Sequence, residues 1–137
     1  YILVITNFLG NHSAGTSLYS NSFNQEFVDK VDNIDQPNDK GWNAIIMAAY
    51  NQNKPALEIL VEKGANINST NPKGTTVFMY AKTKCLENRN FGFLDFVLSL
   101  GADINARDKK KNWTVLDYVK DIGDEEMISY LLSKGAI

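Results

Sequence analysis

The feature that most constrains this chain is a phrase that it repeats three times. The phrase reads "VEKGANIN" at residues 61–68, "LSLGADIN" at residues 98–105 and "LSKGAI" at residues 132–137. Its glycines, Gly64, Gly101 and Gly135, are separated by 37 and 34 residues. A period of about 20–50 residues is typical of proteins in which one small unit stacks on copies of itself. Such an architecture directs the search for function to a surface rather than to a single active site.

A helix is predicted before each of these glycines. Counting back from Gly64, apolar residues stand three, four, five and seven places upstream, and the other two units repeat this spacing. The spacing places an apolar stripe along one side of a helix. The residues that can cap the start of this helix are Asn53, Asn90 and Asp124. Glycine readily adopts the left-handed conformation that commonly follows a helix end, so each phrase reads as the end of an amphipathic helix.

An earlier helix is predicted in every unit as well. The segments "GWNAIIMAAY", "GTTVFMYAKT" and "NWTVLDYVKD" begin at Gly41, Gly74 and Asn112. Two places after each start stands a residue that can cap a helix, namely Asn43, Thr76 and Thr114. Polar segments rich in turn residues separate the units. Each unit therefore reads as turn, helix, short loop, helix and glycine.

With these elements in register, the chain resembles the ankyrin-repeat family, whose units approximate D-x-x-G-x-T-P-L-H-x-A-A followed by V-x-x-L-L-x-x-G-A-D-x-N. The matching elements are Gly41 with Ala48 and Ala49, Gly74 with Thr76 and Ala81, and the phrases "GANIN" and "GADIN". The T-P-L-H box is degenerate in all three units, as is more typical of bacterial or other non-vertebrate members. The resemblance covers residues 35–137 and implies an all-α fold, an ankyrin-repeat solenoid of helix-turn-helix units joined by hairpin-like turns.

The predicted units differ in length and in completeness. They are an atypical amino-terminal capping repeat at 1–34, ankyrin repeats at 35–68 and 69–105, and a carboxyl-terminal capping repeat at 106–137. Gly74 and Gly101 are 27 residues apart, whereas Gly41 and Gly64 are 23 apart. Because about four residues make one helical turn, this four-residue insertion predicts a first helix one turn longer in that unit. Residues 1–9 fit either a first helix or an added strand.

The residue inventory argues against catalysis. His12 is the single histidine and Cys85 the single cysteine, and no third group is evident that would orient them as a nucleophile pair. We interpret His12 as an exposed loop residue and Cys85 as a small residue inside the lengthened helix. No phosphate loop and no zinc or calcium spacing occurs. We therefore expect neither an enzyme nor a bound cofactor.

Charge and hydropathy narrow the range of partners. A net charge of −2 gives no general attraction to nucleic acid or anionic lipid. The basic run from Arg107 to Lys111 reads as a solvated loop, with nucleic-acid binding as the less favoured alternative. The longest apolar run, at residues 1–5, is too short to span a membrane. The lone cysteine suits a reducing compartment, so the cytoplasm is favoured. Because the chain starts at Tyr1, it reads as a processed product, and a secreted or periplasmic protein after signal removal also fits.

The family resemblance implies a concave binding face made of turn tips and first helices. The residues at its positions are Asp39, Lys40, Trp42, Tyr50, Asn51, Lys73, Thr75, Thr83, Lys84, Lys110, Lys111, Trp113 and Asp121. Trp42 and Trp113 share one slot, where we expect both indoles to be largely exposed. Exposed tryptophans are typical binding hot spots, so these two, flanking Lys73 and Thr75, are the best candidates. The alternative is that each indole packs on a neighbouring turn.

The sequence thus predicts a non-catalytic module, monomeric on its own, that binds another protein through this face. An inhibitor or immunity-type role fits a short chain without a second domain. The alternative is a fragment of a larger solenoid with only a structural or assembly role, which the missing initiator Met favours. That alternative predicts an open apolar surface at one end of the stack.

Overall fold

The computed structural model describes residues 34–137, which form six helices arranged as three pairs. The pairs are α3 (Ala44–Tyr50) with α4 (Lys54–Glu62), α5 (Val77–Asn88) with α6 (Phe91–Ser99), and α7 (Val115–Ile122) with α8 (Glu125–Ser133). These residues contain no strand, only an isolated antiparallel bridge between Thr70 and Thr76. The all-α class predicted from the sequence is confirmed. Each helix pair falls inside one predicted unit, although the unit boundaries themselves stay a prediction.

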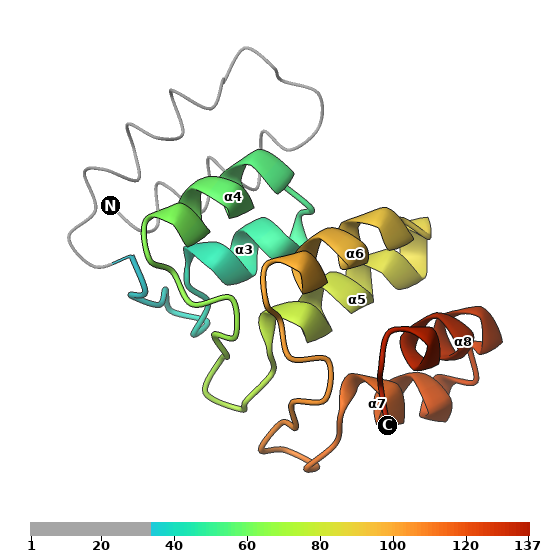
Figure 1. Ribbon diagram of the computed structural model, residues 1–137. Helices are drawn as coiled ribbons and strands as arrows, with labels where there is room; N and C mark the ends of the chain where they lie inside the picture. The colour runs from blue at the N-terminus through green and yellow to red at the C-terminus, as the bar shows by residue number, and fades with distance from the viewer. Residues whose placement is uncertain (1–33) are drawn as a thin grey trace.

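The helices stack in two layers (Figure 1). The first helices form a row in which α5 contacts both α3 and α7. The second helices α4, α6 and α8 each pack on the first helix of their own pair. The turn tips that connect the units project together beyond the row of first helices (Figure 1). This stacking leaves one side of α3, α5 and α7, together with the tips, as a continuous surface.

The six helix caps predicted from the sequence are all in place. In the first helices, the side chains of Asn43, Thr76 and Thr114 accept hydrogen bonds from backbone N–H groups of the first turn. Asn53, Asn90 and Asp124 do the same for the second helices. Satisfying these otherwise unpaired N–H groups stabilises a helix by about 1 kcal/mol per cap. The caps therefore hold the helix starts although the T-P-L-H box is degenerate.

The insertion in the second unit lengthens its first helix, as predicted. Helix α5 has 12 residues, whereas α3 has seven and α7 has eight. It ends at Asn88, and the next residue, Arg89, adopts a left-handed conformation with φ 60°. The Arg89 guanidinium then reaches the next unit, where its Nη2 lies 2.7 Å from Oδ2 of Asp124 at the start of α8. The extra turn thus adds an ionic contact between neighbouring units.

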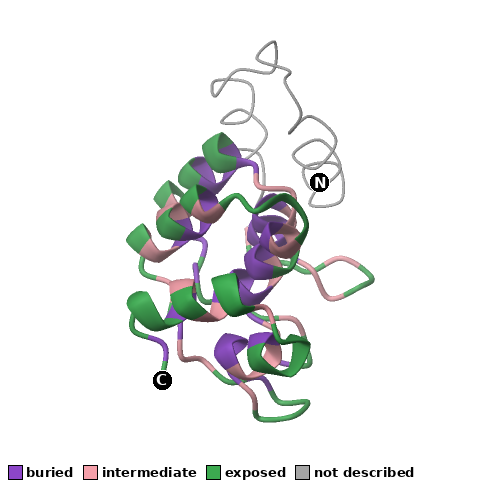
Figure 2. Ribbon diagram, turned by 90° about the vertical axis from the view of Figure 1, so that its right-hand side faces the viewer, coloured by how far each residue is buried: buried purple, intermediate pink, exposed green. Residues whose placement is uncertain are grey.

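The hydrophobic core runs between the two helix layers and from unit to unit (Figure 2). The largest fully buried side chains are Phe78, Ile45, Ile46, Leu57, Leu60, Leu94, Leu116, Met127, Leu131 and Val77. Small residues lie where adjacent first helices meet, with Ala48 and Ala81 both completely buried. Close packing of this kind makes each unit depend on its neighbour for stability.

The repeated phrase forms the joints of the stack. Gly64, Gly101 and Gly135 follow helix ends with φ of 97°, 100° and 100°, which is the left-handed role predicted for them. The last asparagine of the phrase adds contacts to the next unit: Oδ1 of Asn68 accepts from the N–H of Asp103 at 2.8 Å. Asn105 repeats this with Ile137 at 3.1 Å. The repeated phrases therefore have a structural role: they end the helices and join neighbouring units.

Several sequence predictions lie outside the described residues. They concern the capping repeat at 1–34, apart from its last residue, the loop position of His12, and the choice between helix and strand at 1–9.

Candidate functional site

The turn tips beside the first helices are held by one asparagine or aspartate in each unit. The Oδ1 atom of Asn71 accepts hydrogen bonds from the backbone N–H groups of Lys73 and Thr75, both at 2.9 Å. Asn38 and Asp108 hold the other two tips in the same way. Side chains of this type commonly stabilise turns by such local bonds. The tips are therefore structured elements that present their side chains in fixed directions.

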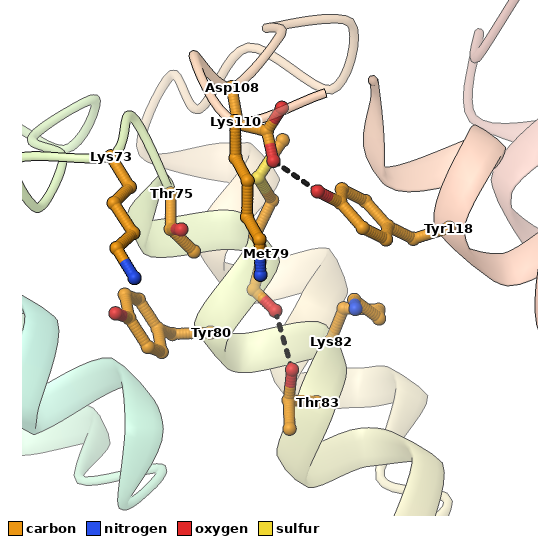
Figure 3. Close-up of a pocket in the computed structure, with 9 residues that line it drawn as sticks. All are labelled: Lys73, Thr75, Met79, Tyr80, Lys82, Thr83, Asp108, Lys110 and Tyr118. Atoms are coloured by element: carbon orange, nitrogen blue, oxygen red, sulfur yellow. Dashed lines mark hydrogen bonds between the residues drawn. The ribbon is translucent and has the colours of Figure 1, made fainter. Parts of the chain in front are cut away.

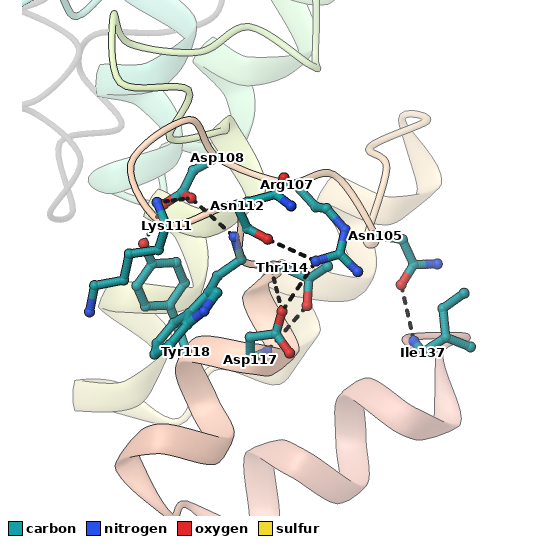
Figure 4. A network of polar contacts seen from close by, with 10 residues as sticks. Asn105, Arg107, Asp108, Lys111, Asn112, Thr114, Asp117, Tyr118 and Ile137 are labelled. Atoms are coloured by element: carbon teal, nitrogen blue, oxygen red, sulfur yellow. Dashed lines mark hydrogen bonds and ion pairs between the residues drawn. The ribbon is translucent and has the colours of Figure 1, made fainter.

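In the second and third units, a tyrosine from the first helix forms a hydrogen bond with the residue that holds the tip. The tyrosine accepts this bond in the second unit and donates it in the third. The Nδ2 amide of Asn71 donates to the Tyr80 hydroxyl at 2.9 Å. In the next unit the Tyr118 hydroxyl donates to Oδ2 of Asp108 (Figure 4). The change from an amide to a carboxylate explains the reversal, because an ionised carboxylate only accepts hydrogen bonds.

Trp42 is not largely exposed, and the sequence prediction on this point is wrong. Its indole is partly buried and packs against Tyr50 and Tyr80, with ring centroids 5.4 and 5.1 Å away. Its Nε1 atom donates to the Tyr80 hydroxyl at 3.0 Å. The indole is covered because the first helix of the following unit supplies Tyr80. The three rings form an aromatic cluster that joins two units.

Trp113 is also only partly exposed, for a similar reason. Its ring centroid lies 5.0 Å from that of Tyr118 in the same unit. The Nζ atom of Lys111 stands 4.4 Å from the indole centroid, within range of a cation–π contact. Both tryptophans therefore act as partly covered aromatic platforms beside cationic side chains.

A pocket of about 210 Å³ opens between the second and third units. Its lining residues are Lys73, Thr75, Met79, Tyr80, Lys82, Thr83, Asp108, Lys110 and Tyr118. Figure 3 shows Lys73 and Lys110 extending from neighbouring tips toward α5, with Lys82 on the side of Tyr118. The two tips are tied together, because the N–H of Lys109 donates to the carbonyl oxygen of Lys73 at 2.8 Å. The pocket therefore has a defined rim.

The residues predicted for the binding face fall into several settings. Lys84 and Asp121 lie outside the pocket, with Lys84 paired to Glu87 and Asp121 exposed on α7. Four line the pocket: Lys73, Thr75, Thr83 and Lys110. Four more belong to the aromatic platforms: Trp42, Tyr50, Lys111 and Trp113. Lys40 and Asp39 are exposed at the first tip. Asn51, the residue that caps the end of α3, also has a structural role, since its Nδ2 donates to the carbonyl oxygen of Met47.

Sequence reasoning missed five of the pocket residues, and Lys82 is the most informative of them. Lys82 is only 8% exposed, although lysine is rarely buried without a partner. A signal was available, because Lys82 occupies the slot of the buried Ala49 in the preceding unit. Tyr80 and Tyr118 likewise share one slot in successive units. Their meeting with Asn71 and Asp108 depends on turn geometry that spacing alone does not reveal.

The electrostatics of the pocket are set by burial and by hydrogen bonds. Burial lowers the pKa of Lys82, because the ammonium group loses water. Burial alone would raise the pKa of Asp108, but hydrogen bonds from Tyr118 and from backbone N–H groups lower it below its usual value. The same bond from Tyr118 to Asp108 raises the pKa of Tyr118 to about 12. Asp108 is therefore an ionised carboxylate already engaged by the protein.

Cys85 is buried inside α5, in the place predicted for it. Burial raises the pKa of its thiol to about 11, which disfavours the reactive thiolate. Residues 34–137 contain no group of three or more His, Cys, Asp or Glu side chains arranged to hold a metal ion. In the same range, each helix is too short or too polar to cross a bilayer.

Comparison with known proteins identifies related chains. A family model for ankyrin repeats in three copies matches residues 10–108. A protein of fowlpox virus (strain NVSL) named as an ankyrin repeat protein is 32% identical over 96 residues, or 68% of this chain. A second protein so named, from Acanthamoeba polyphaga mimivirus, is 30% identical over 93 residues, or 65% of this chain.

These two relatives are much longer than the region they share with this chain. The aligned region is 27% of the fowlpox virus protein and 14% of the mimivirus protein. The similarity therefore concerns the repeat region. Both relatives come from viruses, and the bacterial or other non-vertebrate character expected from the degenerate boxes stays a prediction.

Proposed function

Because this chain belongs to the ankyrin-repeat family, we propose that it is a non-catalytic module that binds a partner protein through its turn tips and first helices. Ankyrin repeats generally mediate protein–protein interaction and are generally non-catalytic. Stacked repeats present an extended surface to which each unit contributes. In this proposal the units at 35–68, 69–105 and 106–137 each supply one tip and one first helix, and residues 1–34 cap the stack.

One observation carries the proposal: the face combines aromatic platforms and cationic side chains on turns already fixed by hydrogen bonds. Asn71 and Asp108 hold the tips, and Trp42 is fixed by its bond to Tyr80. A surface that is ordered before binding loses little conformational entropy when a partner docks. Aromatic side chains in such settings supply much of the energy of protein interfaces.

We assign contact with the partner to the residues that the family resemblance places on this face. They are Asp39, Lys40, Trp42, Tyr50, Asn51, Lys73, Thr75, Thr83, Lys110, Lys111 and Trp113. The finer proposal is an inhibitor or immunity-type protein, which acts by covering the surface of an enzyme or toxin. Such a role needs a fixed face and no catalytic group.

A site-specific cross-linking experiment tests this proposal. A photoreactive phenylalanine replaces Thr83 on the proposed face or, as a control, Glu58 on the exposed side of α4. We expect a cross-linked protein at Thr83 and none at Glu58 in extracts of the cells that make this protein. The captured protein is then purified, and its Kd is measured for Thr83→Arg and Glu58→Arg variants. Binding weakened by Glu58→Arg but not by Thr83→Arg contradicts the proposed face.

A second candidate is a purely structural segment within a longer solenoid. The observation that favours it is a group of exposed apolar side chains in the last unit, Ile122, Leu132 and Ile137. Exposed apolar surface at the end of a repeat stack is what a further unit would cover. Under this candidate, polar substitutions at these three positions abolish assembly with an adjoining segment, whereas Thr83→Arg has no effect.

A further inference from the structure

The pocket between the second and third units contains a buried lysine that forms no ion pair with the described residues. Lys82 is 8% exposed, and no carboxylate of residues 34–137 forms an ion pair with it. Its Nζ atom lies 5.6 Å from the centroid of the Tyr118 ring, within range of a cation–π contact. Burying an unpaired ammonium group is unfavourable. The position therefore calls for a reason beyond packing, since Ala49 fills the same slot in the preceding unit.

Two more ammonium groups reach the same pocket. Lys73 and Lys110 line it from adjacent turn tips and extend toward α5 (Figure 3). Neither forms an ion pair with a carboxylate of the described residues. Lys109 is close by, because it lines a second, neighbouring pocket together with Pro72, Lys73 and Lys110. This region of the face is therefore strongly cationic.

Tyr80 adds a hydrogen-bond donor with no acceptor among the described residues. Its hydroxyl oxygen accepts from Nε1 of Trp42 and from Nδ2 of Asn71. The orientation of the Asn71 amide is fixed, because its Oδ1 accepts from two backbone N–H groups. A phenol that has accepted two hydrogen bonds still carries one proton to donate. Tyr80 is thus prepared to donate to a further acceptor.

The carboxylate that lines the pocket, Asp108, supplies one negative charge against three lysines. It accepts hydrogen bonds from the Tyr118 hydroxyl and from the backbone N–H groups of Lys111 and Trp113. Its Oδ1 is engaged by the third turn tip and its Oδ2 by Tyr118 of α7, and it forms no ion pair with Lys82. The pocket is thus lined by three lysines, one carboxylate and a tyrosine whose hydroxyl has a spare proton.

We propose that this pocket receives a carboxylate side chain from an acidic segment of the partner protein. The inference rests on the proposed function, since it assumes that a protein docks on this face. Phosphate is favoured by arginine forks and bare N–H groups at helix starts. Here no arginine lines the pocket, and Thr76 already accepts from the N–H of Met79. The aromatic platform at Trp42 lies beside Tyr80 and offers contact area to a polypeptide.

A peptide titration tests the proposal directly. The probe is a decapeptide of alternating Glu and Gly. Its binding is followed through the two-dimensional ¹H–¹⁵N NMR spectrum of the protein. A decapeptide of alternating Gln and Gly and inorganic phosphate are titrated separately for comparison. We expect the Glu peptide to shift the amide signals of Thr75, Lys82 and Thr83, and the Gln peptide to leave them in place. Equal effects of the Gln peptide overturn the proposal. Saturation by phosphate that displaces the Glu peptide overturns it in favour of a phosphate ligand.

Matched variants then localise the effect. Lys82→Met removes the buried charge, and Lys120→Met makes the same change at the equivalent but exposed slot of α7. We expect Lys82→Met to weaken binding of the Glu peptide about tenfold and Lys120→Met less than about twofold. Lys110→Met, on an exposed turn, gives the same test should Lys82→Met fail to fold. If Lys120→Met weakens binding of the Glu peptide as much as the pocket variants do, the proposed pocket site is wrong.

The two proposals fail in different ways. If the captured partner cross-links at Thr83 and binds Lys82→Met and Lys110→Met as tightly as the unaltered protein, the pocket proposal is wrong and the binding face stands. If no partner cross-links at Thr83 but the Glu peptide still occupies the pocket, the proposed function is wrong and the pocket remains an acidic-peptide site.

Discussion

Replacing Asp108 tests how the turn tips are held, and it has a natural reference within the chain. Asn71 does in the second unit what Asp108 does in the third, and each contacts the tyrosine of its own unit. Asp108→Asn should therefore convert the third tip to the hydrogen-bond pattern of the second. The new amide would donate to Tyr118, as Asn71 donates to Tyr80. Asp108→Ala offers no such substitute and removes every bond.

The magnitudes follow from the contacts of Asp108. Its side chain is 5% exposed and accepts from two backbone N–H groups, at 3.1 and 3.2 Å, as well as from Tyr118. A hydrogen bond to a charged group contributes about 1.5–3 kcal/mol, but water can reach the rim after truncation. We expect Asp108→Ala to lower the free energy of unfolding by about 2–4 kcal/mol. Asp108→Asn, which keeps three bonds of neutral strength, should lower it by about 1 kcal/mol or less.

Equilibrium urea unfolding followed by circular dichroism measures both variants, and pH separates the charge from the geometry. The folded-state pKa of Asp108 lies below its ordinary value near 3.9. Its ionised form therefore stabilises the fold above that pH, and this contribution is lost as the pH falls through the folded pKa. The difference between the unaltered protein and Asp108→Asn should shrink in that window. The reasoning would be refuted if Asp108→Asn lowered the free energy of unfolding as much as Asp108→Ala does. It would also be refuted if Asp108→Ala stayed within about 0.5 kcal/mol of the unaltered protein.

Two further predictions concern backbone conformation and thiol chemistry. Gly74→Ala should lower the free energy of unfolding by about 2–3 kcal/mol in urea titration, because φ is 82° and a Cβ would lie 2.7 Å from the Lys109 nitrogen. Gly64→Ala, with φ 97° but no atom within 4 Å, should lower it by only about 1 kcal/mol; equal losses would contradict the close approach of the tips. Cys85 should react with a thiol reagent at pH 8 only when the protein unfolds, because burial raises its pKa to about 11; rapid reaction of the folded protein would show that α5 opens locally.

Much of the fold could be predicted because its signals are local and repeated. Each cap, such as Thr76, lies within three residues of the N–H group that it satisfies. Each glycine, such as Gly64, ends its own helix. The four-residue insertion adds one turn to α5, since an in-phase insertion lengthens a helix without rotating its apolar face. Repetition in three units made these short-range signals reinforce one another.

The candidate site was less predictable because its contacts cross between units. The exposure of Trp42 depends on Tyr80, which lies 38 residues further along the chain. Asp108 and Tyr118 are closer in sequence, but their contact depends on how the tip folds back on α7. The family resemblance placed Thr75 and Thr83 on the same face, yet it could not show that Lys82 also lines the pocket between the second and third units. Predicting such contacts requires knowing how two units are placed relative to each other, and the periodicity of the sequence does not determine this.

Repetition also separates what the fold requires from what it merely tolerates. The slot after Ala48, Ala81 and Val119 holds buried Ala49 in the first unit and exposed Lys120 in the third. The stability of the fold alone explains an alanine at position 49, where the next unit packs, and a lysine at position 120, which is exposed to solvent. It does not explain Lys82, a lysine in a covered position whose pKa is lowered by burial. A group that is unfavourable for the free protein, beside two further lysines and a hydroxyl with a spare proton, is best explained by a ligand that supplies the missing negative charge.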